Sequence, residues 1–129
     1  MSEQVDATSE LAERVREALE TADLDAMRQL LAPDATWGPP DHPEWGCQNR
    51  DEVLAWFRHG RDGGGRARVI DVIAGPDTLL VGLEVTGFPR AGRDGPVERW
   101  QVMTVRHGSV KDICGFDNRA EAARRAGLP

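Results

Sequence analysis

Residues 97–116, VERWQVMTVRHGSVKDICGF, carry the pattern that decides the fold. Apolar and polar side chains alternate on both sides of His107-Gly108-Ser109, which predicts two antiparallel strands, 97–106 and 110–116, joined by a tight turn. Alternation places two sets of side chains on opposite faces of the first strand: Val97, Arg99, Gln101 and Met103 on one, and Trp100, Val102 and Thr104 on the other. Both faces carry large apolar groups, so neither is expected to lie in water.

Two further strands precede this hairpin, at 66–74 and 78–87, and a long loop at 88–96 leads into it. In the strand 78–87 one face is wholly apolar: Leu79, Val81, Leu83 and Val85. The opposite face carries Leu80, Gly82, Glu84 and Thr86. The four strands in succession predict an antiparallel meander.

Helices are predicted before and after the meander along the sequence. Apolar residues recur at helical spacing from Ser9 to Ala22, and Asp23 is expected to cap a second helix that ends at Pro33. The proline-rich segment 34–48 is expected to be an irregular loop, and a capping-box variant at 49–52 opens a third helix. Its buried residues are expected to be Val53, Leu54, Trp56 and Phe57. A short helix at 119–126 closes the chain. This order predicts an α+β fold.

Length and composition predict one domain over residues 8–129, after a disordered segment 1–7. The net charge of −6 disfavours nucleic acid as a partner. The apolar stretches are too short to cross a bilayer and no secretory signal is visible, so we expect a cytoplasmic protein without a membrane partner. The scattered histidines and the two cysteines have no metal-ligand spacing, and no nucleotide-binding motif is present. We therefore expect neither a metal nor a cofactor.

Because both faces of the sheet carry apolar side chains, each face must pack against another part of the protein or against a second chain. One face meets the helices, and no remaining part of the chain is expected to cover the other. We expect the outer face, with the Leu79–Val85 stripe, Trp100 and Val102 together, to be covered by a second copy, which makes a homodimer.

Three stretches together resemble the nuclear transport factor 2-like superfamily, and within it the SnoaL-like branch related to polyketide cyclases. They are DLDAMRQLLAPDATWGPPDHP at 23–43, CQNRDEVLAWF at 47–57, and VMTVRHGSVKDICGFDNRAEAARRAGL at 102–128. The resemblance covers residues ~8–128 in the same order of elements. It implies a cone: a bent antiparallel sheet wrapped round the N-terminal helices, with an interior pocket at the wide end and dimerisation through the sheet. It specifies the fold and leaves the activity open, because enzymes and non-enzymatic modules share it.

The activities of this superfamily can be compared with the chain position by position. Ketosteroid isomerase implies a tyrosine where Val15 stands and an aspartate base where Pro39 stands, so that activity is not expected. Limonene epoxide hydrolase implies carboxylates near Glu84 and at Gly115, and only the first is present. SnoaL-like cyclases imply a late aspartate as base, for which Asp117 is the candidate.

Three residues are candidates for acid–base chemistry. Glu84 is the only charged residue in its strand, and an acid among apolar neighbours can serve as general acid or base. The alternatives are an ion pair with Arg99 or a place in water at the pocket rim. Asp117 is a second candidate, with the cap of the tail helix as its alternative. His42, beside Asp41, is placed to shuttle protons unless it is an exposed loop residue.

The candidates for substrate binding are Trp37, Trp45, Trp56, Arg99, Gln101 and Met103. We expect the aromatic groups to line an apolar cavity, and Arg99 and Gln101 to hold an oxyanion. For Trp56 the alternative is an ordinary core role. The expected function is binding of an apolar, ring-containing metabolite, with acid–base catalysis of a cyclase, isomerase or hydrolase type. The alternatives are a non-catalytic binding protein and a dimerisation module.

Overall fold

The computed structural model describes residues 3–39, 46–87 and 97–127. The predicted site residues His42 and Trp45 lie outside the described residues. The elements, in chain order, are α1 (Glu3–Thr21), α2 (Leu24–Leu30), β1 (Leu31–Gly38), α3 (Arg50–Asp62), β2 (Arg66–Ala74), β3 (Thr78–Thr86), β4 (Val97–Arg106), β5 (Ser109–Phe116) and α4 (Arg119–Ala126).

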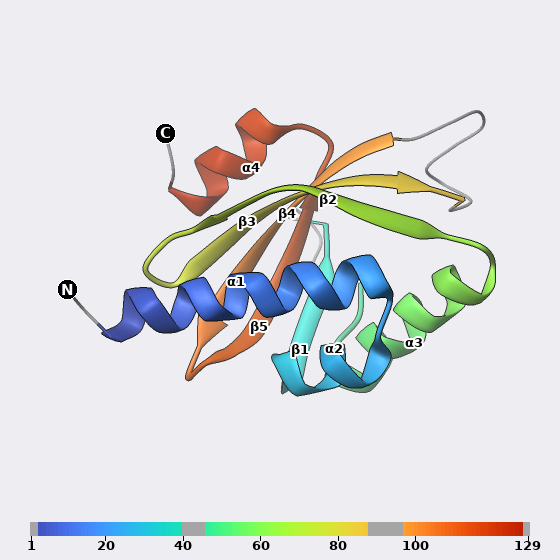
Figure 1. The fold of residues 1–129 in the computed structure, drawn as a ribbon, viewed down its shortest axis with the longest axis horizontal. Helices are drawn as coiled ribbons and strands as arrows, with labels where there is room; N and C mark the ends of the chain where they lie inside the picture. Colours follow the sequence, from blue (N-terminus) through green and yellow to red (C-terminus); the bar gives the residue numbers. More distant parts are fainter. Residues whose placement is uncertain (1–2, 40–45, 88–96, 128–129) are drawn as a thin grey trace.

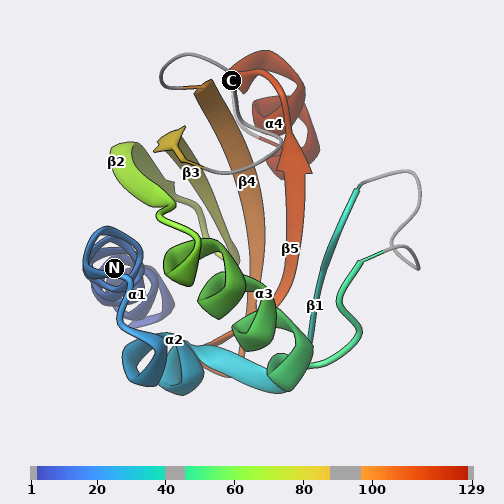
Figure 2. The same ribbon diagram turned by 90° about the vertical axis from the view of Figure 1, so that its right-hand side faces the viewer.

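The five strands form one curved sheet in the order β1-β5-β4-β3-β2 (Figure 1). Helices α1, α2 and α3 lie against its concave face, and α4 packs on the other side (Figure 2). The strands β2 to β5 form the predicted antiparallel meander. The α+β prediction is therefore confirmed, with helices at the start of the chain and an open, bent sheet around them.

The first strand, β1, corrects one expectation. Residues 34–48 were expected to be irregular, but the structure continues β1 through Gly38 and pairs it parallel to β5. Pro33 lies in this strand at the edge of the sheet, where a residue without a backbone N–H removes no interior ladder bond. The sheet consequently has five strands and a parallel pair, which the four-strand meander did not include.

Helix boundaries follow the capping residues. The side chain of Asp23 accepts a hydrogen bond from Ala26 N at 3.1 Å, and that of Asn49 accepts one from Glu52 N at 3.0 Å. Both predicted caps are therefore confirmed. Helix α1 begins at Glu3. The disorder of residues 1–7 stays a prediction.

The concave face of the sheet carries the main core. The stripe Leu79, Val81, Leu83 and Val85 packs in one cluster with Leu11, Val15 and Leu19 of α1. The prediction that this stripe lies on the outer face is therefore wrong. Pairing explains the error: Leu83 lies opposite Arg99 and Glu84 opposite Glu98, so the two strands are offset by one residue from the assumed register. A shift of one residue exchanges the two faces of a strand.

The outer face of the sheet has its cover within the chain. Leu80, Trp100 and Val102 pack there against Ala122 and Ala123 of α4. The expectation that no part of the chain covers this face is therefore wrong, because the tail helix folds back over it (Figure 1). The homodimer stays a prediction, and the Leu79–Val85 stripe no longer supports it. No helix within the described ranges is both long and apolar enough to cross a membrane.

Candidate functional site

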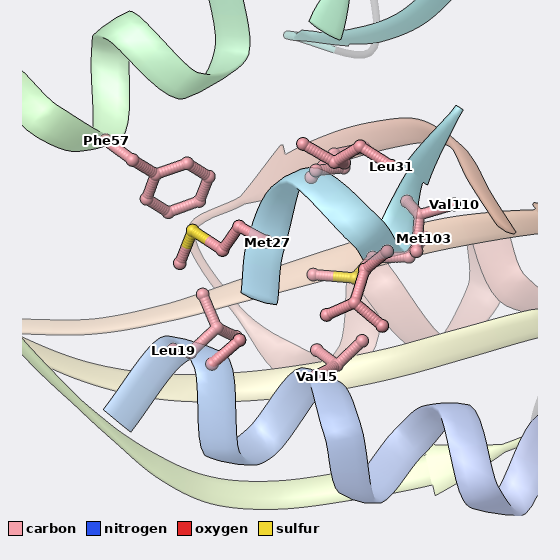
Figure 3. A pocket seen from close by; sticks show the side chains of 10 residues that line it. Val15, Leu19, Met27, Leu31, Phe57, Met103 and Val110 are labelled. Carbon is pink, nitrogen blue, oxygen red and sulfur yellow. The ribbon is translucent and has the colours of Figure 1, made fainter. Parts of the chain in front are cut away.

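A small apolar cavity lies between the sheet and the helices (Figure 3). Its volume is about 30 Å³. The lining side chains are all apolar and come from α1, α2, α3 and the sheet: Val15, Ala18, Leu19, Met27, Leu30, Leu31, Phe57, Met103, Val110 and Ile113. A cavity that holds a benzene ring measures about 150 Å³. An aromatic ligand therefore fits here only after the lining side chains move, and methionine is the most adaptable of them.

Aromatic side chains from β1 and α3 meet at one side of this cavity. The ring of Trp37 stacks on Phe57 at a centroid distance of 5.0 Å, and Trp56 meets Trp37 edge-on at 6.0 Å. Trp37 lies opposite Ile113 in the sheet and packs against the core, and Phe57 lines the cavity. Trp56 is 49% exposed, so the expectation that it is buried is wrong.

Polar side chains gather further along the same concave face. Pairing sets Gln101 of β4 opposite Gly115 of β5. Arg99 is two residues from Gln101, on the same face, and its guanidinium forms an ion pair with Asp117. The structure thus brings together three predicted site residues, Arg99, Gln101 and Asp117.

Gln101 is the one polar residue that is buried among those described, with 6% of its surface exposed. Its Oε1 atom is buried and has no hydrogen-bond partner in the part of the chain that the structure describes. A Cβ added at Gly115 would meet no atom of the described residues within 4 Å. A buried acceptor and an open position therefore lie side by side on the concave face. The sequence analysis did not assign Gly115 to this site. A glycine inside a predicted strand was the available signal, because it marks a place where a ligand can approach the backbone.

The alternative role for Asp117 is settled by its neighbour. The cap of α4 is Asn118, whose side chain accepts a hydrogen bond from Glu121 N at 2.9 Å. Asp117 is therefore not the cap, and its carboxylate is held by Arg99 instead.

Glu84 lies apart from this group, and its place corrects the prediction for it. It shares the outer face with Leu80, and Arg68 of β2 approaches its carboxylate at 3.4 Å. The expected partner Arg99 is on the opposite face. Gly82 leaves no room for a ligand, because the indole of Trp100 fills the space above it. The structure therefore does not bring Glu84 to the concave site.

The two cysteines, Cys47 and Cys114, are free thiols and each is partly buried. Burial raises the pKa of the Cys47 thiol, and the charge of Glu52 raises it further. Burial also raises the pKa of Cys114, which Arg125 lowers and Asp112 raises to a smaller extent. Among the described residues, no group of three or more His, Cys, Asp or Glu side chains is placed to hold a metal ion.

Comparison with known proteins identifies the family. A family model described as the SnoaL-like domain matches residues 12–113. No curated protein matches the chain. A candidate ketosteroid isomerase from Kribbella flavida has a similar structure, with a TM-score of 0.74 and 19% identity over 90% of this chain and 81% of that one.

Two further solved structures share the fold. A candidate polyketide cyclase from Sinorhizobium meliloti has a TM-score of 0.65 and 21% identity, over 83% of this chain and 94% of the other. TerC, co-crystallised with polyporic acid, has a TM-score of 0.67 and 15% identity, over 93% and 97%. At these identities the likeness shows the fold alone. The match of the family model over most of the chain shows more: this protein belongs to the SnoaL-like domain family.

Proposed function

We propose that this protein binds a small, largely apolar, ring-containing molecule on the concave face of its sheet, over Gly115. The observation that carries the proposal is the open position at Gly115 beside the buried amide of Gln101. Binding sites for small molecules are concave and apolar, with a few polar groups that fix the orientation of the ligand.

The surroundings of Gly115 support a flat, apolar ligand. Ile113, two residues earlier on the same face, lines the apolar cavity, and Trp37 lies opposite Ile113. Met103 and Met27 line the same cavity, and their flexible side chains can move to admit a ring. That TerC, with the same fold, was co-crystallised with an organic molecule supports the proposal by analogy only.

A second candidate function is acid–base catalysis on the same ligand. It is favoured by the ion pair of Asp117 with Arg99 on the concave face, since Asp117 is not the helix cap. In this account the Asp117 carboxylate takes a proton from the bound molecule, and the Arg99 guanidinium stabilises the negative charge that develops on its oxygen. Glu84 has no part in it, because it lies on the other face of the sheet.

Filling the open position tests the binding proposal. We would titrate the protein with a fluorescent naphthalene sulfonate probe and compare wild type with Gly115→Leu. The matched control is Thr104→Leu, which adds bulk to a partly exposed position on the outer face of the neighbouring strand. We expect Gly115→Leu to weaken probe binding about tenfold or more and Thr104→Leu to leave it unchanged. Equal binding by wild type and Gly115→Leu, with both variants folded by melting temperature, would contradict the proposal.

A further inference from the structure

The side chain of Gln101 holds a buried hydrogen-bond acceptor that is not satisfied by residues 3–39, 46–87 or 97–127. Its Oε1 atom is buried and unpartnered within the described residues. Leaving a buried acceptor unpaired destabilises the folded protein, because the acceptor has lost its hydrogen bonds to water. Such groups are normally satisfied by protein, by ordered water or by a ligand. The protein therefore keeps an acceptor that a bound molecule with a donor can satisfy.

One donor group on the same face, the guanidinium of Arg99, is turned toward another partner. Arg99 lies two residues away along β4, but its Nη1 donates to the carboxylate of Asp117. The two residues paired directly with Gln101 carry no side-chain donor: Val81 lies opposite it on β3 and Gly115 opposite it on β5. The open position at Gly115, directly opposite Gln101, gives a ligand room to bring a donor to this amide.

We infer that the ligand of this site carries a hydroxyl group attached to its apolar ring, of phenol or enol type, which donates a hydrogen bond to Gln101 Oε1. This inference rests on the proposed binding function and names the chemical class of the ligand. A ring over Gly115 places such a hydroxyl next to the amide. A ligand that lacks the donor leaves the acceptor unpaired, and sites built in this way reject the analogue without the hydroxyl.

Three one-ring molecules separate the possibilities. Phenol carries an O–H donor, anisole carries an oxygen that only accepts, and toluene carries neither. Their affinities for wild type and for Gln101→Met can be measured by NMR titration. The methionine side chain keeps the length of glutamine without its amide. Comparing ratios between the two proteins cancels the different tendencies of the three molecules to leave water.

We expect Gln101→Met to lower the phenol-to-toluene affinity ratio about tenfold, and to leave the anisole-to-toluene ratio unchanged. If Gln101→Met does not fold, Gln101→Asn, which withdraws the amide by one methylene, is expected to lower the same ratio. An unchanged phenol ratio would overturn the inference while leaving the binding proposal intact. So would a loss that anisole shares with phenol, since that would show a ligand acceptor to be the group recognised. Failure of all three molecules to bind wild type would overturn both.

Discussion

The indole of Trp100 packs directly on Gly82, on the outer face of the sheet. The two residues are paired across β3 and β4, and a Cβ added to Gly82 would lie 2.6 Å from the Trp100 Cη2 atom. Trp100 Nε1 donates to Glu98 at 2.6 Å, and the Arg119 guanidinium lies 5.8 Å from the centre of the ring. Gly82 is thus a packing position for the face under α4.

The first prediction concerns this contact. Gly82→Ala forces the buried indole to move, so we expect it to lower the free energy of unfolding by about 1–3 kcal/mol. Denaturant unfolding measures the change. Gly115→Ala is the matched control, because its Cβ meets none of the described atoms within 4 Å and glycine in a strand is unfavourable. It should leave the stability unchanged or slightly raised. Equal losses in the two variants would contradict the assignment of the faces.

The second prediction concerns Glu84. Its side chain is 39% exposed and its partner Arg68 is 66% exposed, and exposed pairs of this kind contribute less than about 1 kcal/mol. Glu84→Gln should therefore lower stability by less than that amount and leave probe binding unchanged. A fluorescence titration checks this. Loss of probe binding in Glu84→Gln would contradict this prediction and show that the Glu84 carboxylate takes part in binding.

The third prediction separates Asp117 from Asn118. Asn118→Ala removes the cap of α4 and should lower the free energy of unfolding by about 1 kcal/mol. Asp117→Asn removes an exposed partner of Arg99 and should cost clearly less. If Asp117 is the base of a reaction, Asp117→Asn would also lower its rate by about two orders of magnitude or more. A larger stability loss in Asp117→Asn than in Asn118→Ala would show that the cap is wrongly assigned.

Much of the fold could be predicted because its signals are local. Alternation predicted the bounds of β2 and β4 as observed, and a closing glycine, Gly127, predicted the end of α4. Cap chemistry predicted the starts of α2 and α3. Alternation does not say which face of one strand matches which face of the next. That depends on the loop 88–96, whose length is compatible with either register. The exchange of faces between β3 and β4, and hence the misplacement of Glu84, came from this one-residue ambiguity.

In the candidate site, too, local features could be predicted and contacts between distant segments could not. Arg99, Gln101 and Asp117 were correctly assigned to one face, because β4 and β5 are joined by a tight turn that fixes their register. Trp56 was misjudged, since its helical spacing is compatible with the edge of the buried stripe as well as with its centre. The pairing of β1 with β5 joins residues far apart in the chain, and no local pattern encodes it.

The fourth prediction concerns pH and the two cysteines. Burial raises the pKa of both Cys47 and Cys114, so fewer thiolates form in the folded protein than in the unfolded chain at the same alkaline pH. Alkylation by iodoacetamide should therefore reach its half-maximal rate at a higher pH than in a urea-unfolded control. By linkage, the free energy of unfolding should fall as the pH rises from the unfolded pKa through the folded one. Identical pH profiles in the two states would contradict this.

The measurement that tests the central claim most directly is an NMR titration of ¹⁵N-labelled protein with phenol. If phenol binds over Gly115, the NMR signals of the Gly115 backbone amide and the Gln101 side-chain amide should show the largest chemical-shift changes. Both changes should saturate at the same phenol concentration. The backbone amide of Gly82 and the indole N–H of Trp100, on the other face, should shift little. Shifts confined to Gly82 and Trp100, or no saturable shift at Gly115 and Gln101, would contradict a binding site on the concave face.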